Sequence, residues 1–185
     1  LREEFVLPSF KEEAWGIILD LGTVLVDETD LEMTPLPGAK EFLKDAFAYF
    51  STKIGFCSSL SPASAGKSLD NLIAGSQELE VLKRTLSTEI LKTQIHSGAY
   101  FRAALRILLS DFNELIVVDN NVQALIAALY AGYGWAILIA DEVPESIDVV
   151  LDGHKSEFHP DVQANLEERF VIVPSVQALK LPSQT

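Results

Sequence analysis

The polar residues best suited to chemistry in this sequence stand at the ends of short apolar runs. Asp20 ends "GIILD", Ser58 and Ser59 end "KIGFCSS", and Asp119 and Asn120 end "LIVVDN". A carboxylate can attack phosphorus or bind magnesium, and a hydroxyl can donate a hydrogen bond to a phosphoryl oxygen. A core needs no polar side chains at these positions, so we treat them as one candidate site.

The elements that position these residues alternate along the chain. Helical spacing of apolar residues and turn residues predict helices within residues 37–50, 97–112 and 121–134. Between and around them, β-rich apolar runs predict strands at 16–20, 53–58, 115–119, 135–140 and 170–173, with a weaker candidate at 79–82.

This alternation predicts an α/β fold in three layers, with a Rossmann-like, mostly parallel sheet of about five strands and helices on both faces. Ligands of such sheets bind beyond the carboxyl ends of the strands. The three polar strand ends would therefore meet at one edge of the sheet. The acidic segment 141–170 is longer than a usual connection and is expected to be a solvated loop or a partner surface.

Composition limits the class of protein. The 185 residues are 48% hydrophobic and 22% charged, which fits one globular domain at 15–181, with an N-terminal extension at 1–14 and a tail at 182–185. The single Cys57 excludes an intrachain disulfide, and the net charge of -13 argues against nucleic acid and anionic membrane as partners. A cytoplasmic location is the default expectation, and Leu1 in place of an initiator Met is consistent with a truncated N-terminus.

The motifs resemble those of the haloacid dehalogenase (HAD) superfamily over most of residues 15–180. "IILDLGTVLVD" aligns with that family's first motif, D-x-D-x-[TV]-L, and "KIGFCSS" with its second. "PLPGAKEFL" is similar to the helix start that precedes the second motif, and "VVDNNVQALIAALYAG" to the fourth motif and its Ala-Ala helix.

The resemblance implies roles for individual residues. Asp20 would be the nucleophile and a magnesium ligand, and the backbone carbonyl of Gly22 would be a second ligand, with Asp119 and Asn120 completing the metal site. Ser58 and Ser59 would bind phosphate. The lysine of the third motif would be Lys92, or Lys83 or Arg84 would fill its role, or no residue would. Mg²⁺ is the implied cofactor, in a weakened site.

Three departures from the family pattern bear on activity. Gly22 stands where the family's general acid and base is expected, Asn120 replaces a carboxylate, and Ala124 leaves no acidic residue four places further on. Loss of a general acid typically costs about 10²- to 10⁴-fold in rate. Only 16 residues separate Asp20 from Pro37, which leaves room for a short hairpin and no cap domain.

Two functions therefore remain open. The first is a HAD-like protein with eroded motifs, weakly active or non-catalytic, that acts as a binding or scaffolding module. The second is an active Mg²⁺-dependent phosphohydrolase that uses Asp20 and a replacement acid such as Asp27, Glu28 or Asp119. A protein partner, a phosphorylated substrate and an oligomer are all compatible with the sequence.

Overall fold

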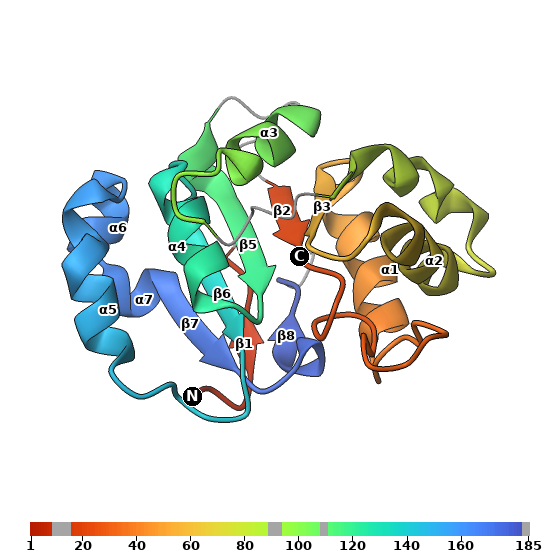
Figure 1. Cartoon of the computed structure of the whole chain (residues 1–185), viewed down its shortest axis with the longest axis horizontal. Coiled ribbons are helices and arrows are strands. Elements are labelled where there is room, and N and C mark those ends of the chain that lie inside the picture. The colour runs from red at the N-terminus through yellow and green to blue at the C-terminus, as the bar shows by residue number, and fades with distance from the viewer. Residues whose placement is uncertain (9–15, 89–93, 108–110, 183–185) are drawn as a thin grey trace.

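Six strands form one all-parallel sheet in the order β4-β3-β2-β5-β6-β7 (Figure 1). The computed structural model describes residues 1–8, 16–88, 94–107 and 111–182. Every residue of β2, β3 and β5 is buried, as expected for strands covered on both faces. The strands are β2 Gly16–Leu19, β3 Ile54–Ser58, β4 Leu86–Thr88, β5 Leu115–Asp119, β6 Trp135–Ile139 and β7 Phe170–Val173.

Helices cover both faces of this sheet, which confirms the predicted α/β fold. The side chains of β2 alternate: Ile17 and Leu19 pack in one apolar cluster with α1 and α2, whereas Ile18 packs in a second cluster with α3, α4 and α5. The helices are α1 Ala39–Phe50, α2 Pro62–Ile73, α3 Ala99–Arg106, α4 Val122–Tyr130, α5 Ile147–His154, α6 Pro160–Ala164 and α7 Leu166–Arg169. Short 3₁₀ helices lie at η1 Gln77–Thr85, η3 Phe112–Glu114, η4 Lys155–Glu157 and η5 Val176–Ala178.

Residues 21–36 form a short hairpin between β2 and α1. Its two arms meet at an antiparallel bridge between Val26 and Pro35, and the amide of Asp27 donates to the carbonyl of Thr34 at 2.8 Å. The amide of Leu36 donates to the carbonyl of Leu25 at 2.8 Å, which closes the base of the hairpin. The predicted short hairpin is therefore present at this position.

The weak strand candidate at 79–82 was wrong. This stretch lies in η1, where Leu79 and Leu82 are both buried. Residues three apart lie on one side of a 3₁₀ helix, so the spacing of these leucines belongs to that helix and not to a strand. The sixth strand is β4, which begins four residues after Leu82 and pairs with β3.

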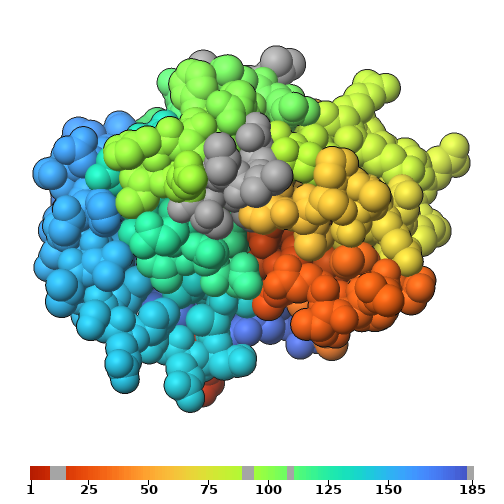
Figure 2. All heavy atoms as spheres, viewed as in Figure 1, coloured from red at the N-terminus to blue at the C-terminus, as the bar shows by residue number. Residues whose placement is uncertain are grey.

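The expectation of a solvated loop at 141–170 was also wrong for most of its length. This segment contains α5, η4, α6 and α7, which stack beyond the β7 edge of the sheet (Figure 1). Ile147 and Leu151, one helical turn apart, are buried against the second apolar cluster. Atoms of this segment, drawn in blue, form one side of the molecular surface (Figure 2).

The two ends of the described chain meet in a separate two-stranded parallel sheet. Its strands are β1 Phe5–Val6 and β8 Leu179–Lys180, and Phe5 is opposite Leu179. Phe5 also contacts the ring of Trp135 in β6, with ring centroids 6.3 Å apart. Within the described residues, no helix is both long and apolar enough to cross a membrane.

Gly134 offers a test of the packing before β6. A Cβ atom at this position would lie 1.6 Å from the backbone oxygen of Asn113, so Gly134→Ala would force two backbone segments apart. We expect a loss of about 1–3 kcal/mol or more in the free energy of unfolding, measured by urea denaturation. Gly66→Ala in α2 is the control, because among the described residues no side chain and no backbone outside its own stretch of helix lies within 4 Å of its added Cβ. Equal stability of the two variants would contradict the close approach at Gly134.

Candidate functional site

The order of the strands brings the predicted polar residues to one edge of the sheet. β2 lies between β3 and β5, with Leu19 opposite both Phe56 and Val118. The amide of Asp20 donates to the carbonyl of Val118 at 2.9 Å, so Asp20 continues the line of β2 at the point where β5 reaches Asp119. Asp20 is 7% exposed, and Ser58 and Asp119 are fully buried.

Ser58 is held at the end of β3 by its own turn. Its Oγ accepts a hydrogen bond from the amide of Leu60 at 3.1 Å. The hydroxyl proton is not used in this bond, so the side chain retains a donor for a phosphoryl oxygen. Ser59 is exposed. The structure thus places Ser58 beside the strand that carries Asp20, while the roles of both serines remain predictions.

Asp119 is anchored by two hydrogen bonds. Tyr100 of α3 donates its hydroxyl to Oδ2 at 2.8 Å, and the amide of Asn121 donates to Oδ1 at 3.0 Å. Burial raises the pKa of Tyr100 well above its usual value, and the charge of Asp119 raises it further, so Tyr100 remains a donor. The hydroxyl of Tyr133 in turn donates to the carbonyl of Tyr100 at 2.7 Å. Sequence analysis assigned Tyr100 only to a helix, because its spacing carries no sign of this contact.

Asn120 and Asn121, which follow Asp119 in the sequence, have different surroundings. Asn120 is exposed. Asn121 caps α4, since its side-chain oxygen accepts from the amides of Gln123 at 2.9 Å and Ala124 at 3.2 Å. Ala124 is buried in the second apolar cluster, so that position packs the helix.

A carboxylate lies beside Gly22, although it comes from another part of the chain. A Cβ atom on Gly22 would lie only 2.3 Å from Oε2 of Glu28, which is an exposed residue of the hairpin. The other oxygen, Oε1, accepts from the hydroxyl of Thr23 at 2.7 Å. Thr23 adopts a φ of 63°, a left-handed conformation that is costly for a β-branched residue and that is typical of functional turns.

The other two replacement acids are engaged elsewhere. Asp27 Oδ1 accepts from both the amide and the hydroxyl of Thr29, at 2.9 and 2.6 Å, and the side-chain bond is the main cause that lowers its pKa. A lowered pKa makes Asp27 a poor proton donor near neutral pH. Since Asp119 is buried and bonded to Tyr100, Glu28 is the remaining candidate of the three.

Helix α2 holds the hairpin that carries Glu28. The amine of Lys67 lies 2.9 Å from Oε2 of Glu32 and 3.1 Å from the carbonyl oxygen of Leu31. The side-chain amide of Asn71 donates to the carbonyl of Glu32 at 2.7 Å. These contacts join residues far apart in the sequence and restrict where the hairpin can place its carboxylate.

Two of the three candidates for the third-motif lysine, Lys83 and Arg84, lie in the described part of the chain. Lys92 lies outside the described residues. Lys83 forms ion pairs with Asp70 at 2.9 Å and Glu80 at 2.8 Å, and it precedes the amino end of β4, as Arg84 does. Asp20 and Ser58 lie at the carboxyl ends of their strands. Lys83 and Arg84 lie at the amino ends of the strands, on the opposite side of the sheet. Neither residue therefore follows the carboxyl end of a strand, as Asp20 does.

The donor set suits a weakly held magnesium ion. Asp20 and Asp119 lie at the ends of adjacent strands, and Gly22 is near the start of the hairpin. Asp119 already accepts two hydrogen bonds. Within the described residues, no three His, Cys, Asp or Glu side chains gather as a metal-binding group. Mg²⁺ often uses one or two carboxylates together with water and a substrate phosphate. The residues present therefore fit an ion whose coordination is completed by the substrate.

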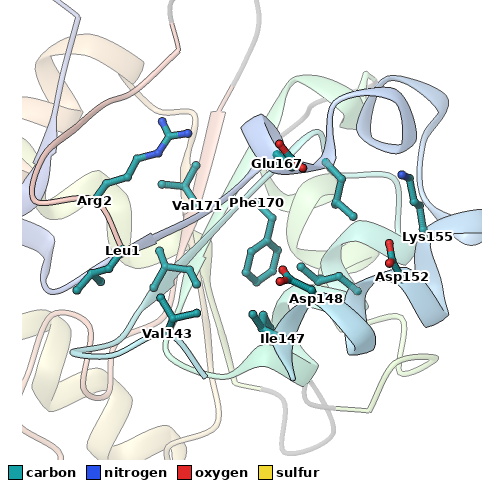
Figure 3. A pocket seen from close by; sticks show the side chains of 13 residues that line it. Leu1, Arg2, Val143, Ile147, Asp148, Asp152, Lys155, Glu167, Phe170 and Val171 are labelled. Carbon is teal, nitrogen blue, oxygen red and sulfur yellow. The ribbon is translucent and has the colours of Figure 1, made fainter. Parts of the chain in front are cut away.

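A pocket of about 540 Å³ lies away from these residues, between α5 and β7 (Figure 3). Phe170, Val171 and Ile147 form part of its apolar wall, and Asp148 and Asp152 project from α5 (Figure 3). Of the predicted site residues that the structure describes, none lines it. It is thus separate from the candidate site at the strand ends.

Similarity to one solved structure supports the fold. The match with this structure covers 87% of the present chain and 88% of the other chain, with a TM-score of 0.55 and 16% sequence identity. A HAD family hydrolase from Deinococcus radiodurans R1, solved with bound phosphate and sodium, gives a TM-score of 0.47 and 17% identity. That match covers 76% of this chain and 55% of the hydrolase. No protein-family model and no curated protein matches the sequence.

The buried tyrosines predict how stability responds to alkaline pH. Burial raises the pKa of both Tyr100 and Tyr133 well above the usual value, so the folded protein keeps protons that the unfolded chain releases above about pH 10. The unfolded state then binds fewer protons, and the free energy of unfolding falls as the pH rises past about 10.

We expect Tyr100→Phe to lower the free energy of unfolding by about 1–3 kcal/mol at pH 7, because the buried carboxylate of Asp119 loses a hydrogen-bond donor. Above about pH 10 the free energy of unfolding of this variant should fall less steeply with pH than that of the wild type. The difference in slope corresponds to one proton, the one that Tyr100 keeps in the folded state. Urea denaturation at a series of pH values measures both effects. Parallel pH curves for the two proteins would contradict the assignment to Tyr100.

Proposed function

We propose that this chain is a distant HAD-type phosphohydrolase that cleaves phosphate monoesters with Asp20 as nucleophile and Glu28 as general acid and base. The observation that carries the proposal is the carboxylate of Glu28, whose Oε2 lies 2.3 Å from where a Cβ of Gly22 would be. In the family pattern the residue aligned with Gly22 supplies this carboxylate. The hairpin thus offers the missing group from a position six residues further along the chain.

The arrangement of the strand ends supports the first half of such a reaction. Asp20 presents a carboxylate at the end of the central strand β2, and Ser58 lies at the end of the neighbouring β3. An oxygen of Asp20 would attack phosphorus while the bond from phosphorus to the alcohol oxygen breaks. The alcohol oxygen would take the proton of Glu28, and the alcohol would leave. The phosphoryl group would remain bonded to Asp20 as an aspartyl-phosphate.

The second half returns the groups to their starting state. Water would attack the phosphorus of the aspartyl-phosphate, and Glu28 would accept the proton of that water. The bond between phosphorus and the oxygen of Asp20 breaks, which releases inorganic phosphate and restores the carboxylate. Glu28 suits both steps because it is exposed and can therefore meet the alcohol and the water.

Magnesium would be held by Asp20, Asp119 and the carbonyl of Gly22. When bound, it would reduce the repulsion between the carboxylate and the phosphate. Ser58 would donate its hydroxyl proton to a phosphoryl oxygen, and Tyr100 would orient Asp119 through their 2.8 Å hydrogen bond. The net charge of -13 favours a substrate that brings few negative charges beyond its phosphate.

The second candidate is a non-catalytic module that binds a phosphate-like ligand or a protein partner. The observation that favours it is the state of the fourth motif: Asp119 is bonded to Tyr100, and Asn120 carries no charge. Fewer ionised ligands weaken the hold on magnesium, and with it the chemistry. Asp20 and Ser58 would then serve only to recognise the ligand.

Hydrolysis of p-nitrophenyl phosphate with and without magnesium separates these two functions. We expect activity in the wild type, none in Asp20→Asn, and a loss of about 10²- to 10⁴-fold in kcat for Glu28→Gln. Glu78→Gln, which changes an exposed glutamate on η1, is the matched control and should retain full activity. Activity that is unaffected by Asp20→Asn would sink the proposed mechanism, and an inert wild type across metals and pH would favour the binding module.

A transfer of the carboxylate between the two positions gives a sharper test. Glu28→Ala should lower kcat like Glu28→Gln, and the double variant Gly22→Asp with Glu28→Ala should recover part of the loss, because the acid returns to the family's position. Gly22→Asp alone should be less stable than the wild type, since its side chain meets Glu28. Steady-state kinetics and thermal denaturation measure both effects. No recovery in a well-folded double variant would count against Glu28 as the replacement acid.

A further inference from the structure

A second pocket, of about 340 Å³, lies on the same edge of the sheet as Asp20 and reaches the turn that holds Glu28. Thr23 lines this pocket, and the same Thr23 donates its hydroxyl to Glu28 at 2.7 Å. Another part of the wall comes from the carboxyl ends of β6 and β7, at Ile139 and Pro174. Open parallel sheets bind ligands at such strand ends, so the position is that of a ligand site.

The register of the strands relates this pocket to the candidate site. Asp119 lies opposite Leu138, so Ile139 begins the wall one strand along from Asp119. On the other side, Val24 and Leu36 belong to the base of the hairpin, and Lys67 of α2 contacts its far side at Glu32. The pocket therefore lies between the hairpin that carries Glu28 and the ends of β6 and β7.

The lining of the pocket favours a compact apolar group. Val24, Leu36, Ile139 and Pro174 present apolar side chains, and the volume is at the lower end of the roughly 300–1,000 Å³ typical of ligand pockets. Asp141 is the acidic residue of the lining, and it is exposed. Within the described residues, Asp141 takes part in no ion pair, so its charge is available to act on a ligand.

We infer that this pocket binds the alcohol part of the substrate and selects phosphate monoesters of compact, apolar alcohols that carry no second negative charge. The inference rests on the proposed function. With phosphorus at Asp20 and the acid at Glu28, the alcohol oxygen must lie next to Glu28, and Thr23 joins Glu28 directly to the pocket. Burial of an apolar alcohol against the apolar wall stabilises the complex. The negative charge of Asp141 repels an alcohol that bears a carboxylate or a further phosphate.

Three substrates of graded chemistry test this selection. We would measure phosphate release from 2-naphthyl phosphate, ethyl phosphate and 2-carboxyphenyl phosphate. The wild type should prefer 2-naphthyl to ethyl phosphate in kcat/KM by at least about ten-fold, which is the discrimination that a few buried carbons supply. It should also disfavour the 2-carboxyphenyl ester.

Variants of two lining residues connect this preference to the pocket. Ala140→Phe fills the pocket and should lower the preference for 2-naphthyl over ethyl phosphate by about ten-fold. Asp141→Asn should raise the rate with the 2-carboxyphenyl ester relative to 2-naphthyl phosphate. Ala74→Phe and Glu142→Gln are the matched controls, because both residues are exposed and neither lines the pocket. Hydrolysis without a preference, or a preference unchanged by Ala140→Phe, overturns the inference while the proposed function stands.

A binding measurement separates failure of the pocket from failure of the chemistry. If no phosphate ester is cleaved, the proposed function falls, and binding of 2-naphthol, followed by its own fluorescence, then decides on the pocket. Binding by the wild type that is at least about ten-fold weaker in Ala140→Phe supports the pocket as a site for apolar alcohols. Absence of binding in the wild type, or equal binding in both proteins, overturns it.

Discussion

The pairing of β2 with β3 on one side and β5 on the other is the constraint on which the rest of this structure depends. All three strands are buried on both faces, so they can carry polar side chains only where they end. The parallel register brings those ends together, with Asp20 bonded through its amide to Val118. A sheet that is buried on both faces thus gathers its polar side chains, such as Asp20 and Ser58, at the carboxyl ends of its strands.

The carboxylate beside Gly22 is the basis of the acid role that we propose for Glu28. Glu28 reaches the same space from the hairpin, and the arrangement depends on a left-handed Thr23 whose hydroxyl holds the carboxylate. Lys67 and Asn71 of α2 fix the far side of the hairpin. The position of the Glu28 carboxylate thus depends on contacts within the hairpin and between the hairpin and α2.

The hydrogen bond from Tyr100 to Asp119 stabilises the fold but limits the proposed metal site. Its hydroxyl satisfies Asp119, which as a buried carboxylate would otherwise be costly, and Tyr133 supports it from behind. This network strengthens the core between α3 and β5, but it occupies part of the coordination that a metal would use. The same buried carboxylate therefore serves both stability and the proposed cation site, and the contact with Tyr100 sets how much is left for the cation.

The sequence by itself determined the class of fold and the position of the candidate nucleophile. Apolar runs such as 16–20 and 115–119 were sufficient because a strand buried on both faces leaves a continuous local pattern, and a residue at its end is placed with it. Contacts between distant segments leave no such pattern. Only the tertiary structure could place Glu28 beside Gly22 or join Tyr100 to Asp119, because each contact depends on the path of a turn or a helix through space. For the same reason the sequence could not exclude Lys83, whose distance from the site follows from the direction in which β4 runs.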